Sequence, residues 1–188
     1  MSINTVEVEL FRHPIYAAYA ANKYGEIFSL KFGKIKSIGS RVSKAGYLRF
    51  TICIGGRAKS YLTHRFIYEC INNEILDSNI EIDHIDRNPK NNNITNLRKV
   101  SRITNCLNRF ENKEVDRLPY DAIKVIQYNS HKFKDYYFSP RTNCLYKYSD
   151  DDYLFEIPFK TQDRATIYST ENRSVRITLN KLREILGC

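Results

Sequence analysis

Asp83, His84 and Asn105 are the residues whose types and spacing could perform chemistry. A histidine is largely neutral near pH 7 and can accept a proton from water. Carboxylate and amide oxygens are the ligands that hard divalent cations prefer. The three residues could therefore hydrolyse a phosphodiester, with His84 as general base and Asp83 and Asn105 as ligands of one Mg²⁺ or Mn²⁺ per active site.

The elements around these residues must bring them together. A short strand is predicted just before Asp83, a second strand over 96–100, and a helix that Ser101 caps and that carries Asn105. Adjacent residues of a strand point to opposite faces, so Asp83 and His84 can serve one site only where the strand ends. The turn-forming residues Asp86, Asn88 and Pro89 indicate that it ends there.

The same stretch resembles a known family. The resemblance rests on His84, Asp86, Asn88, Asn91, Asn92, Ile94, Asn96 and Leu97. In this order they are similar to the motif of HNH endonucleases of the homing type, which use a ββα-metal fold. The resemblance implies that His84 is the general base and that Asp83 and Asn105 bind the metal ion. It also implies that Asn96 is structural and holds the loop to the strands.

The resemblance extends toward the N-terminus and covers roughly residues 16–109. His64 and Arg65 match the His-Arg pair that precedes the motif, and the segments 24–30 and 46–49 look like the small β-rich module that often comes before it. For His64 we favour a packing role over a catalytic one. Two positions depart from the family pattern, since Arg87 stands where Gly is common and Lys99 stands near a usual Trp.

Each residue alone has a simpler interpretation. An isolated Asp-His pair is more often part of a turn, the asparagine tract is typical of a loop, and Asn105 alone would be an ordinary helix-surface residue. The ordered set on strand, loop, strand and helix favours the nuclease interpretation instead.

The net charge of +9 favours an acidic polymer, and we expect double-stranded DNA as the partner. Basic residues gather between residues 23 and 59, where Glu26 is the one acid, and a sheet that contacts phosphates is favoured over a merely solvated face. The candidate DNA-binding residues are Lys31, Lys34, Lys36, Arg41, Lys44, Arg49, Arg57 and Lys59 in this region and Arg87, Lys90, Arg102 and Arg109 near the motif.

The sequence predicts no membrane segment and no secretion signal, so we expect a cytoplasmic protein that remains with its DNA. The five cysteines form no CxxC pair, so we expect reduced thiols and no zinc ribbon.

The predicted fold class is α+β, with modules in series. Residues 1–62 form a small basic β-sheet module, 63–109 a helix followed by the ββα-metal motif, 110–119 a linker, and 120–188 a mostly β module that ends in a helix. Gly55-Gly56 predicts a hairpin turn. The last module repeats the order hairpin then helix, and either a degenerate copy of the first module or coincidence explains this.

These patterns predict a DNA endonuclease of the HNH type that hydrolyses phosphodiesters with one metal ion and prefers particular sites, as a phage or mobile-element enzyme does. A catalytically inactive DNA-binding protein derived from such a nuclease and a dimeric restriction-type endonuclease are the alternatives. The oligomeric state stays open, with a monomer favoured.

Overall fold

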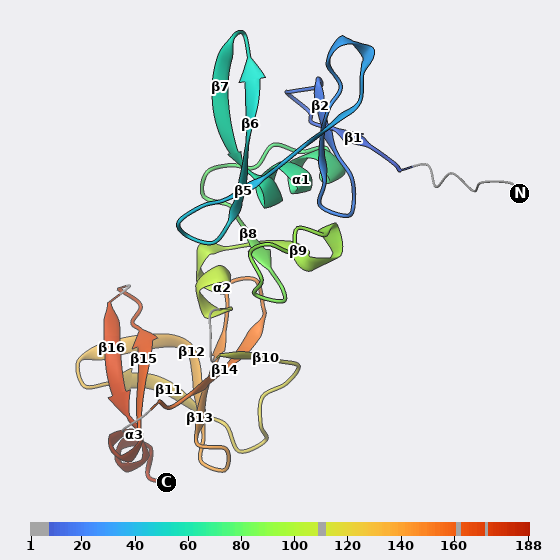
Figure 1. Cartoon of the computed structure of the whole chain (residues 1–188). Helices are drawn as coiled ribbons and strands as arrows, with labels where there is room; N and C mark the ends of the chain where they lie inside the picture. The colour runs from blue at the N-terminus through green and yellow to red at the C-terminus, as the bar shows by residue number, and fades with distance from the viewer. Residues whose placement is uncertain (1–7, 109–111, 161–162, 172) are drawn as a thin grey trace, which may run out of the picture. The chain divides into compact units, whose positions relative to one another are not determined.

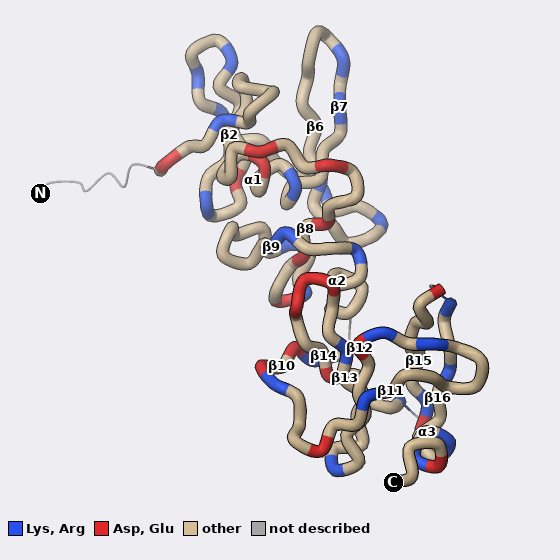
Figure 2. Tube along the Cα trace, turned by 180° about the vertical axis from the view of Figure 1, so that it is seen from behind, with Lys and Arg blue, Asp and Glu red and all other residues tan. Residues whose placement is uncertain are grey.

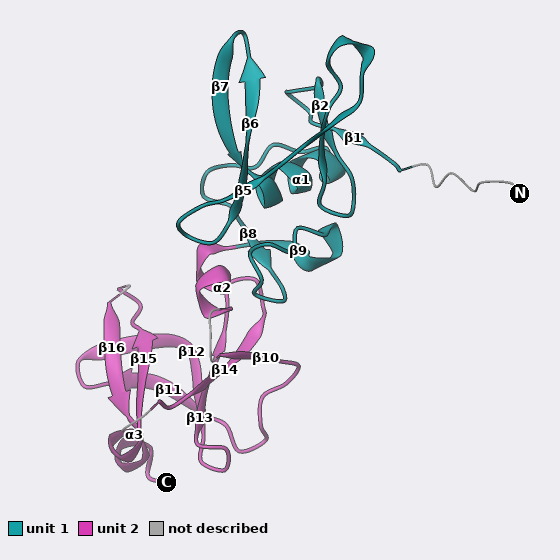
Figure 3. Cartoon of the chain, in the orientation of Figure 1, with its two compact units in different colours: residues 1–100 teal, residues 101–188 magenta. Residues whose placement is uncertain are grey.

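The computed structural model of the chain describes residues 8–108, 112–160, 163–171 and 173–188 (Figure 1). The chain divides into two compact units, residues 1–100 and residues 101–188 (Figure 3). Each unit has its own hydrophobic core, and each is described by itself below.

Unit 1 contains short antiparallel strands and one longer helix. A first sheet has the order β1-β2-β3-β4 and a second the order β5-β6-β7, and β8 pairs with β9. The bounds are β1 (Phe11–Arg12), β2 (Tyr19–Ala21), β3 (Ile27–Ser29), β4 (Lys36–Ile38), β5 (Arg41–Val42), β6 (Leu48–Ile54), β7 (Arg57–Leu62), α1 (Thr63–Asn72), β8 (Glu81–His84) and β9 (Leu97–Val100), with 3-10 turns η1 (Lys31–Gly33) and η2 (Ile94–Asn96).

The hairpin β6–β7 confirms the predicted turn. Ile54 pairs with Arg57, so Gly55 and Gly56 form a two-residue loop, and both have positive φ (55° and 77°). Such a loop needs two left-handed residues, which glycine adopts without strain. Along β6 the apolar side chains Phe50 and Ile52 alternate inward, while the distal half of the hairpin is exposed.

Helix α1 lies at the centre of the unit 1 core. Its fully buried Phe66 and Ile67 and the buried Cys70 pack with residues of β2, β3, β6 and β8. The helix begins directly after β7 and ends at Asn72, and the next residue, Asn73, closes the last turn in a left-handed conformation (φ 50°). The β6–β7 hairpin is therefore joined rigidly to the helix that underlies the predicted motif.

Unit 2 begins with the helix of that motif. The bounds are α2 (Arg102–Leu107), β10 (Lys113–Val115), β11 (Ile123–Tyr128), β12 (His131–Ser139), β13 (Cys144–Tyr148), β14 (Leu154–Pro158), β15 (Arg164–Tyr168), β16 (Ser174–Thr178) and α3 (Leu179–Leu186). An antiparallel sheet has the order β10-β14-β13-β12-β11, and β15 and β16 form a separate hairpin. Their inward residues, among them Phe138, Phe155 and Ile177, build the second core with Leu182 of α3.

The strand-rich architecture with few helices agrees with the predicted α+β class. The structure divides between Val100 and Ser101, whereas we expected a linker at 110–119, of which residues 110 and 111 lie outside the described residues. The boundary between compact units need not coincide with a boundary between functional modules. The division into modules at 1–62, 63–109, 110–119 and 120–188 therefore stays a prediction. Hairpin β15–β16 followed directly by α3 has the same order as β6–β7 followed by α1, but common descent of the two is untested.

Candidate nuclease site

Asp83 lies on β8 directly opposite Arg98 of β9. The Arg98 Nε donates to Asp83 Oδ2 at 3.0 Å, and both side chains are largely buried. A buried carboxylate is stable only when its charge is balanced, and here the guanidinium balances it. Sequence reasoning missed Arg98, because only the strand register places it beside Asp83.

His84 is the last residue of β8, so the strand ends where we predicted. Its ring is buried, with the residue only 5% exposed. Its Nε2 lies 3.1 Å from Oδ1 of Asn92, which is 4% exposed. Asn92 belonged to the family pattern, but nothing in the sequence indicated that its side chain reaches the histidine.

Two further rings pack against His84. The ring centroids of His64 and His84 are 5.0 Å apart in an edge-to-face arrangement, and Tyr47 lies 5.9 Å from His84. Burial, together with the nearby His84 and Arg65, lowers the pKa of His64 to about 3. His64 is therefore a neutral imidazole at any pH at which the protein would act, and its Nδ1 has no hydrogen-bond partner among the described residues.

Asn96 ties the loop between β8 and β9 together. Its Nδ2 donates to Asp86 Oδ1 and to the Asn91 carbonyl, both at 2.9 Å, and its Oδ1 accepts from the Asp86 N–H at 3.0 Å. Desolvation raises the pKa of Asp86, but hydrogen bonds from Asn91, the Asn88 N–H and Asn96 outweigh it and lower the pKa overall. The side chains of Asp86, Asn91 and Asn96 thus hold the shape of this loop.

Arg87 in the same loop has φ 63°, a left-handed conformation that favours glycine. The family pattern commonly has Gly at this position. The loop therefore keeps the left-handed backbone that suits glycine, although the residue here is Arg.

A turn from the N-terminal sheet supports the loop. The Asn22 Oδ1 accepts from the backbone N–H groups of Tyr24 and Glu26, which closes the turn. Gly25 in this turn (φ 96°) lies so close to Asn92 that a Cβ would come within 3.1 Å of its backbone. The N–H of Ile94 also donates to the Lys23 carbonyl at 3.0 Å.

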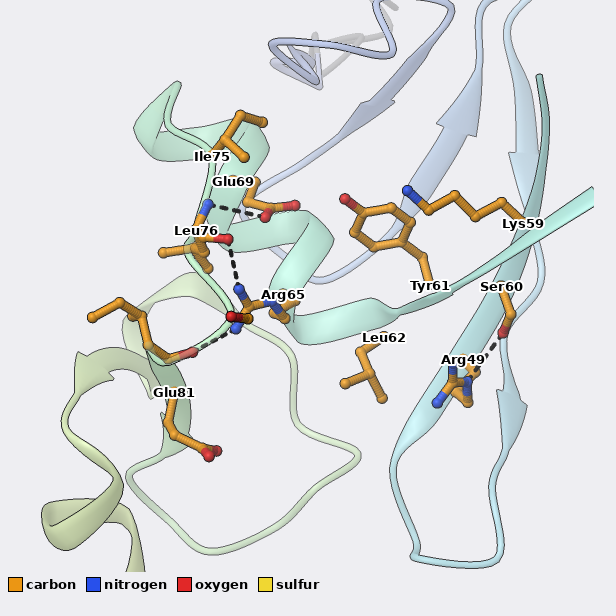
Figure 4. A pocket seen from close by; sticks show the side chains of 12 residues that line it. Arg49, Lys59, Ser60, Tyr61, Leu62, Arg65, Glu69, Ile75, Leu76 and Glu81 are labelled. Atoms are coloured by element: carbon orange, nitrogen blue, oxygen red, sulfur yellow. Dashed lines mark hydrogen bonds between the residues drawn. The ribbon is translucent and has the colours of Figure 1, made fainter. Parts of the chain in front are cut away.

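Arg65 holds the segment that leads into β8. Its guanidinium donates to the carbonyls of Leu76, Asp77 and Ile80. The neighbouring Glu69 accepts from the Leu76 N–H, and Arg65, Glu69 and Leu76 line an open pocket of about 550 Å³ (Figure 4). Arg49 and Lys59 line this pocket as well, but none of the predicted catalytic or metal-binding residues does.

Glu69 of this pocket also forms a buried, structural pair with His13. His13 Nε2 contacts Glu69 Oε2 at 3.1 Å, while His13 Nδ1 accepts from the N–H groups of Ile15 and Tyr16. Because Nδ1 already accepts hydrogen bonds, Nε2 carries the proton and donates it to Glu69. The pair joins the N-terminal segment to α1.

Asn105 lies on α2 in unit 2 and is half-buried. The predicted N-cap is confirmed, since Ser101 Oγ accepts from the Thr104 N–H at 3.2 Å. Asp151, in the turn between β13 and β14, accepts from the Ser101 N–H at 2.8 Å and from the Thr104 hydroxyl. A residue of the C-terminal module therefore holds the start of the helix that carries Asn105.

The predicted metal ligands fit a hard divalent cation by chemistry, because one offers a carboxylate oxygen and the other an amide oxygen. Among the described residues, no group of three or more His, Cys, Asp or Glu side chains could hold a metal ion. A ligand set of one carboxylate and one amide does not form such a group.

The predicted DNA-binding residues are exposed on unit 1, with some exceptions. Figure 2 shows Lys and Arg along β6–β7 and between β3 and β6. Lys31 Nζ donates to the Cys53 carbonyl, Arg49 Nε to Ser60, and Lys59 Nζ to the Tyr16 hydroxyl. Exposed members of the set are Lys34, Lys36, Arg41, Lys44, Arg49, Arg57, Lys59, Arg87 and Lys90, and Arg102 is exposed on unit 2, whereas Lys31 is half-buried. Arg109 lies outside the described residues.

No helix in the described ranges is long and apolar enough to cross a membrane.

Comparison with known proteins identifies the motif. Residues 61–106 match the family model described as HNH endonuclease. DNA endonuclease I-HmuI of Bacillus phage SP01 is 34% identical over 94 residues, which is 49% of this chain and 51% of that protein. H-N-H endonuclease F-TflII of Escherichia phage T5 is 33% identical over 85 residues, which is 45% of this chain and 43% of that protein.

A solved structure described as DNA binding and cleavage by the HNH homing endonuclease I-HmuI aligns with a TM-score of 0.45 at 32% identity, covering 52% of this chain and 55% of the other. This chain spans about half the length of the curated relatives it matches. The resemblance to HNH endonucleases is confirmed by the family model and the phage relatives, and it lies in the part of the chain that holds Asp83, His84, Asn96 and Asn105.

Proposed function

We propose that this protein is a metal-dependent HNH endonuclease that cleaves double-stranded DNA at preferred sites. One observation carries the proposal: the segment that matches the HNH endonuclease model contains the Asp-His pair at the end of β8, the loop-binding Asn96 and the α2 residue Asn105. The phage relatives are named as DNA or H-N-H endonucleases, which supports the same activity here.

In the proposed reaction His84 accepts a proton from water. The water oxygen forms a bond to phosphorus, the bond from phosphorus to the 3′ oxygen breaks, and the leaving oxygen takes a proton from solvent. The products are a 5′-phosphate and a 3′-hydroxyl. General base catalysis of this kind contributes about 10²- to 10⁴-fold to the rate.

Asp83 and Asn105 would hold one Mg²⁺ or Mn²⁺ ion. Such an ion neutralises charge that develops on the phosphate and on the leaving oxygen. In the protein alone, Arg98 pairs with Asp83 and holds this buried carboxylate in its orientation.

The exposed Lys and Arg residues of unit 1 would bind the DNA backbone. Hairpin β6–β7 is a two-stranded ribbon with an exposed distal half, and a ribbon of this kind fits the major groove. Contacts to phosphates from residues such as Lys36 and Arg57 would position the duplex without reading its sequence. The salt dependence of binding would follow from the number of such contacts.

Cleavage of supercoiled plasmid with Mg²⁺ or Mn²⁺ tests the proposal. We expect wild type to convert the plasmid to open circles, and we expect EDTA or His84→Ala to lower the rate by at least about 100-fold with DNA binding retained. His131→Ala, which removes a histidine of unit 2 on β12, is the matched control and should cleave as wild type does.

Wild type that binds DNA tightly at low salt but cuts neither plasmid nor genomic DNA would favour the inactive DNA-binding protein instead. Rapid conversion of the plasmid to linear DNA by a stable dimer, at a palindromic site, would favour the restriction-type enzyme.

A further inference from the structure

We propose that Asn92 is a positioning residue that sets the tautomer of His84 and so decides which ring nitrogen is basic. The proposal rests on the proposed function, since it assigns the proton-accepting atom of that same site. It adds a residue that acts through His84 rather than on the substrate.

The hydrogen bond itself carries the argument. His84 Nε2 lies 3.1 Å from Asn92 Oδ1, and the two residues are 5% and 4% exposed, so water does not compete for this contact. A carbonyl oxygen can only accept, so with this orientation of the Asn92 amide Nε2 carries the proton. A neutral imidazole has one N–H, and the basic lone pair is therefore on Nδ1.

Ring packing alone does not settle this choice. His64 and Tyr47 restrict rotation of the His84 ring, with interplanar angles of 73° and 41°. Such contacts fix the plane of an imidazole but do not distinguish its two nitrogens by charge or hydrogen bonding. The Asn92 amide does distinguish them, because its oxygen faces Nε2.

Asn92 is held firmly enough to act in this way. Gly25 fits against its backbone so closely that a Cβ would come within 3.1 Å of the carbonyl oxygen. The hydrogen bond from the Ile94 N–H to the Lys23 carbonyl fixes the chain just after it. These two contacts hold the backbone from which the Asn92 side chain reaches His84.

The opposite orientation of the amide makes the opposite prediction. With Nδ2 facing His84, the amide would donate to Nε2, and the proton of the ring would move to Nδ1. Hydrogen bonding of the rest of the amide does not decide between the two orientations. In the present orientation Nδ2 is buried without a partner among the described residues, and in the reversed one Oδ1 would be left in the same position. A measurement of the tautomer does choose.

The experiment compares intact wild type with Asn92→Leu, which keeps side-chain volume but removes the acceptor, and with Asn92→Asp, which keeps an acceptor oxygen. Asn93→Ala is the matched control, since Asn93 caps η2 in the same loop by accepting from Thr95. Each protein is examined by ¹⁵N NMR of the His84 ring, by DNA affinity and by single-turnover cleavage of plasmid. All spectra are recorded at the same alkaline pH.

In wild type, Asn93→Ala and Asn92→Asp we expect the ¹⁵N chemical shifts of the His84 ring to be those of the tautomer protonated at Nε2. In Asn92→Leu we expect those shifts to be lost. Cleavage by Asn92→Leu should fall about 10- to 100-fold with DNA affinity unchanged, and Asn92→Asp should restore most of the rate. A merely structural role would lower affinity and rate together and would leave the tautomer as it was.

The proposal is overturned if the ¹⁵N shifts of wild type show His84 protonated at Nδ1. It is also overturned if Asn92→Leu keeps both the wild-type shifts of His84 and the wild-type cleavage rate. If Asn92→Leu does not fold, Asn92→Ser replaces it, and the wild-type spectrum still decides. If wild type cleaves no DNA, the proposed function fails, while the spectra of the variants show whether Asn92 sets the tautomer.

Discussion

His64 shows how burial of a single residue leads to a pH dependence. Its pKa is lowered from 6.5 to about 3 because the ring is buried beside His84 and Arg65. The unfolded chain takes up a proton at this residue as the pH falls through 6.5, whereas the folded protein does not until about pH 3. Stability is therefore lost as the pH falls between these values.

We predict that His64→Phe makes unfolding less sensitive to acid in this window. Phe keeps an aromatic ring against His84 but cannot take up a proton. The free energy of unfolding of wild type should fall more steeply than that of the variant, by up to about 1.4 kcal/mol per pH unit. Urea unfolding at several pH values measures both slopes, and parallel curves from pH 6.5 to 3 would contradict the assignment.

At the residue scale, sequence could predict the reactive types but not their partners. Asp83, His84 and Asn105 stand out because their chemistry and spacing suit a nuclease. Arg98 and Asn92 do not, because each meets its partner only through the register of β8 and β9 or the path of the loop between them. Pairing of this kind depends on tertiary structure, which a local pattern does not encode.

Among the elements, the turn that contains Gly25 supports the loop of the nuclease motif. We predict that Gly25→Ala destabilises the protein by about 1–3 kcal/mol, because Ala is strained at φ 96° and its Cβ would press on Asn92. Cleavage should also slow, because Asn92 would move relative to His84. Urea unfolding and single-turnover cleavage measure the two effects.

Gly33→Ala is the matched control for that substitution. Gly33 also has positive φ (67°), but a Cβ there would meet nothing within 4 Å. Gly33→Ala should therefore be destabilised by backbone strain, as Gly25→Ala is, but should cleave DNA at the wild-type rate. Equal effects of the two substitutions on cleavage would mean that the close contact with Asn92 is unimportant.

The start of α2 depends on an element far away in sequence. We predict that Asp151→Ala lowers the apparent affinity for Mg²⁺ in the cleavage assay about 10-fold, because the Ser101 N–H and the Thr104 hydroxyl lose their acceptor and the helix that carries Asn105 loosens. Asp151→Asn keeps an acceptor and should be milder. An unchanged Mg²⁺ dependence in Asp151→Ala would show that this contact does not support the metal site.

Element prediction succeeded where the local signal was strong. The glycine pair of the β6–β7 turn, the end of β8 at His84 and the Ser101 cap each follow from side-chain chemistry at one position. The hydrogen bonds that Asp151 accepts from Ser101 and Thr104 of the α2 start were not predicted. The sequence contains no local sign of a contact between residues so far apart along the chain.

For the whole molecule, the two hydrophobic cores predict two separately stable units. One core is built from residues between Tyr19 and Leu97, and the other from residues between Leu107 and Leu182. Phe66 and Phe138 are fully buried, one in each core. Truncation of such a side chain to alanine costs about 3–5 kcal/mol, and that loss should remain within the unit that contains it.

We therefore predict that Phe138→Ala speeds hydrogen exchange in β11–β14 and leaves exchange in β6–β9 as in wild type, and that Phe66→Ala has the reverse effect. Exchange followed by mass spectrometry of peptides from each unit measures this directly. Both variants should cleave DNA poorly, because Phe66→Ala loosens the core of the unit that carries His84 and Phe138→Ala loosens the core of the unit that carries Asn105. Faster exchange throughout the chain in either variant would mean that the units unfold as one, and the division at Ser101 would then not be a boundary of stability.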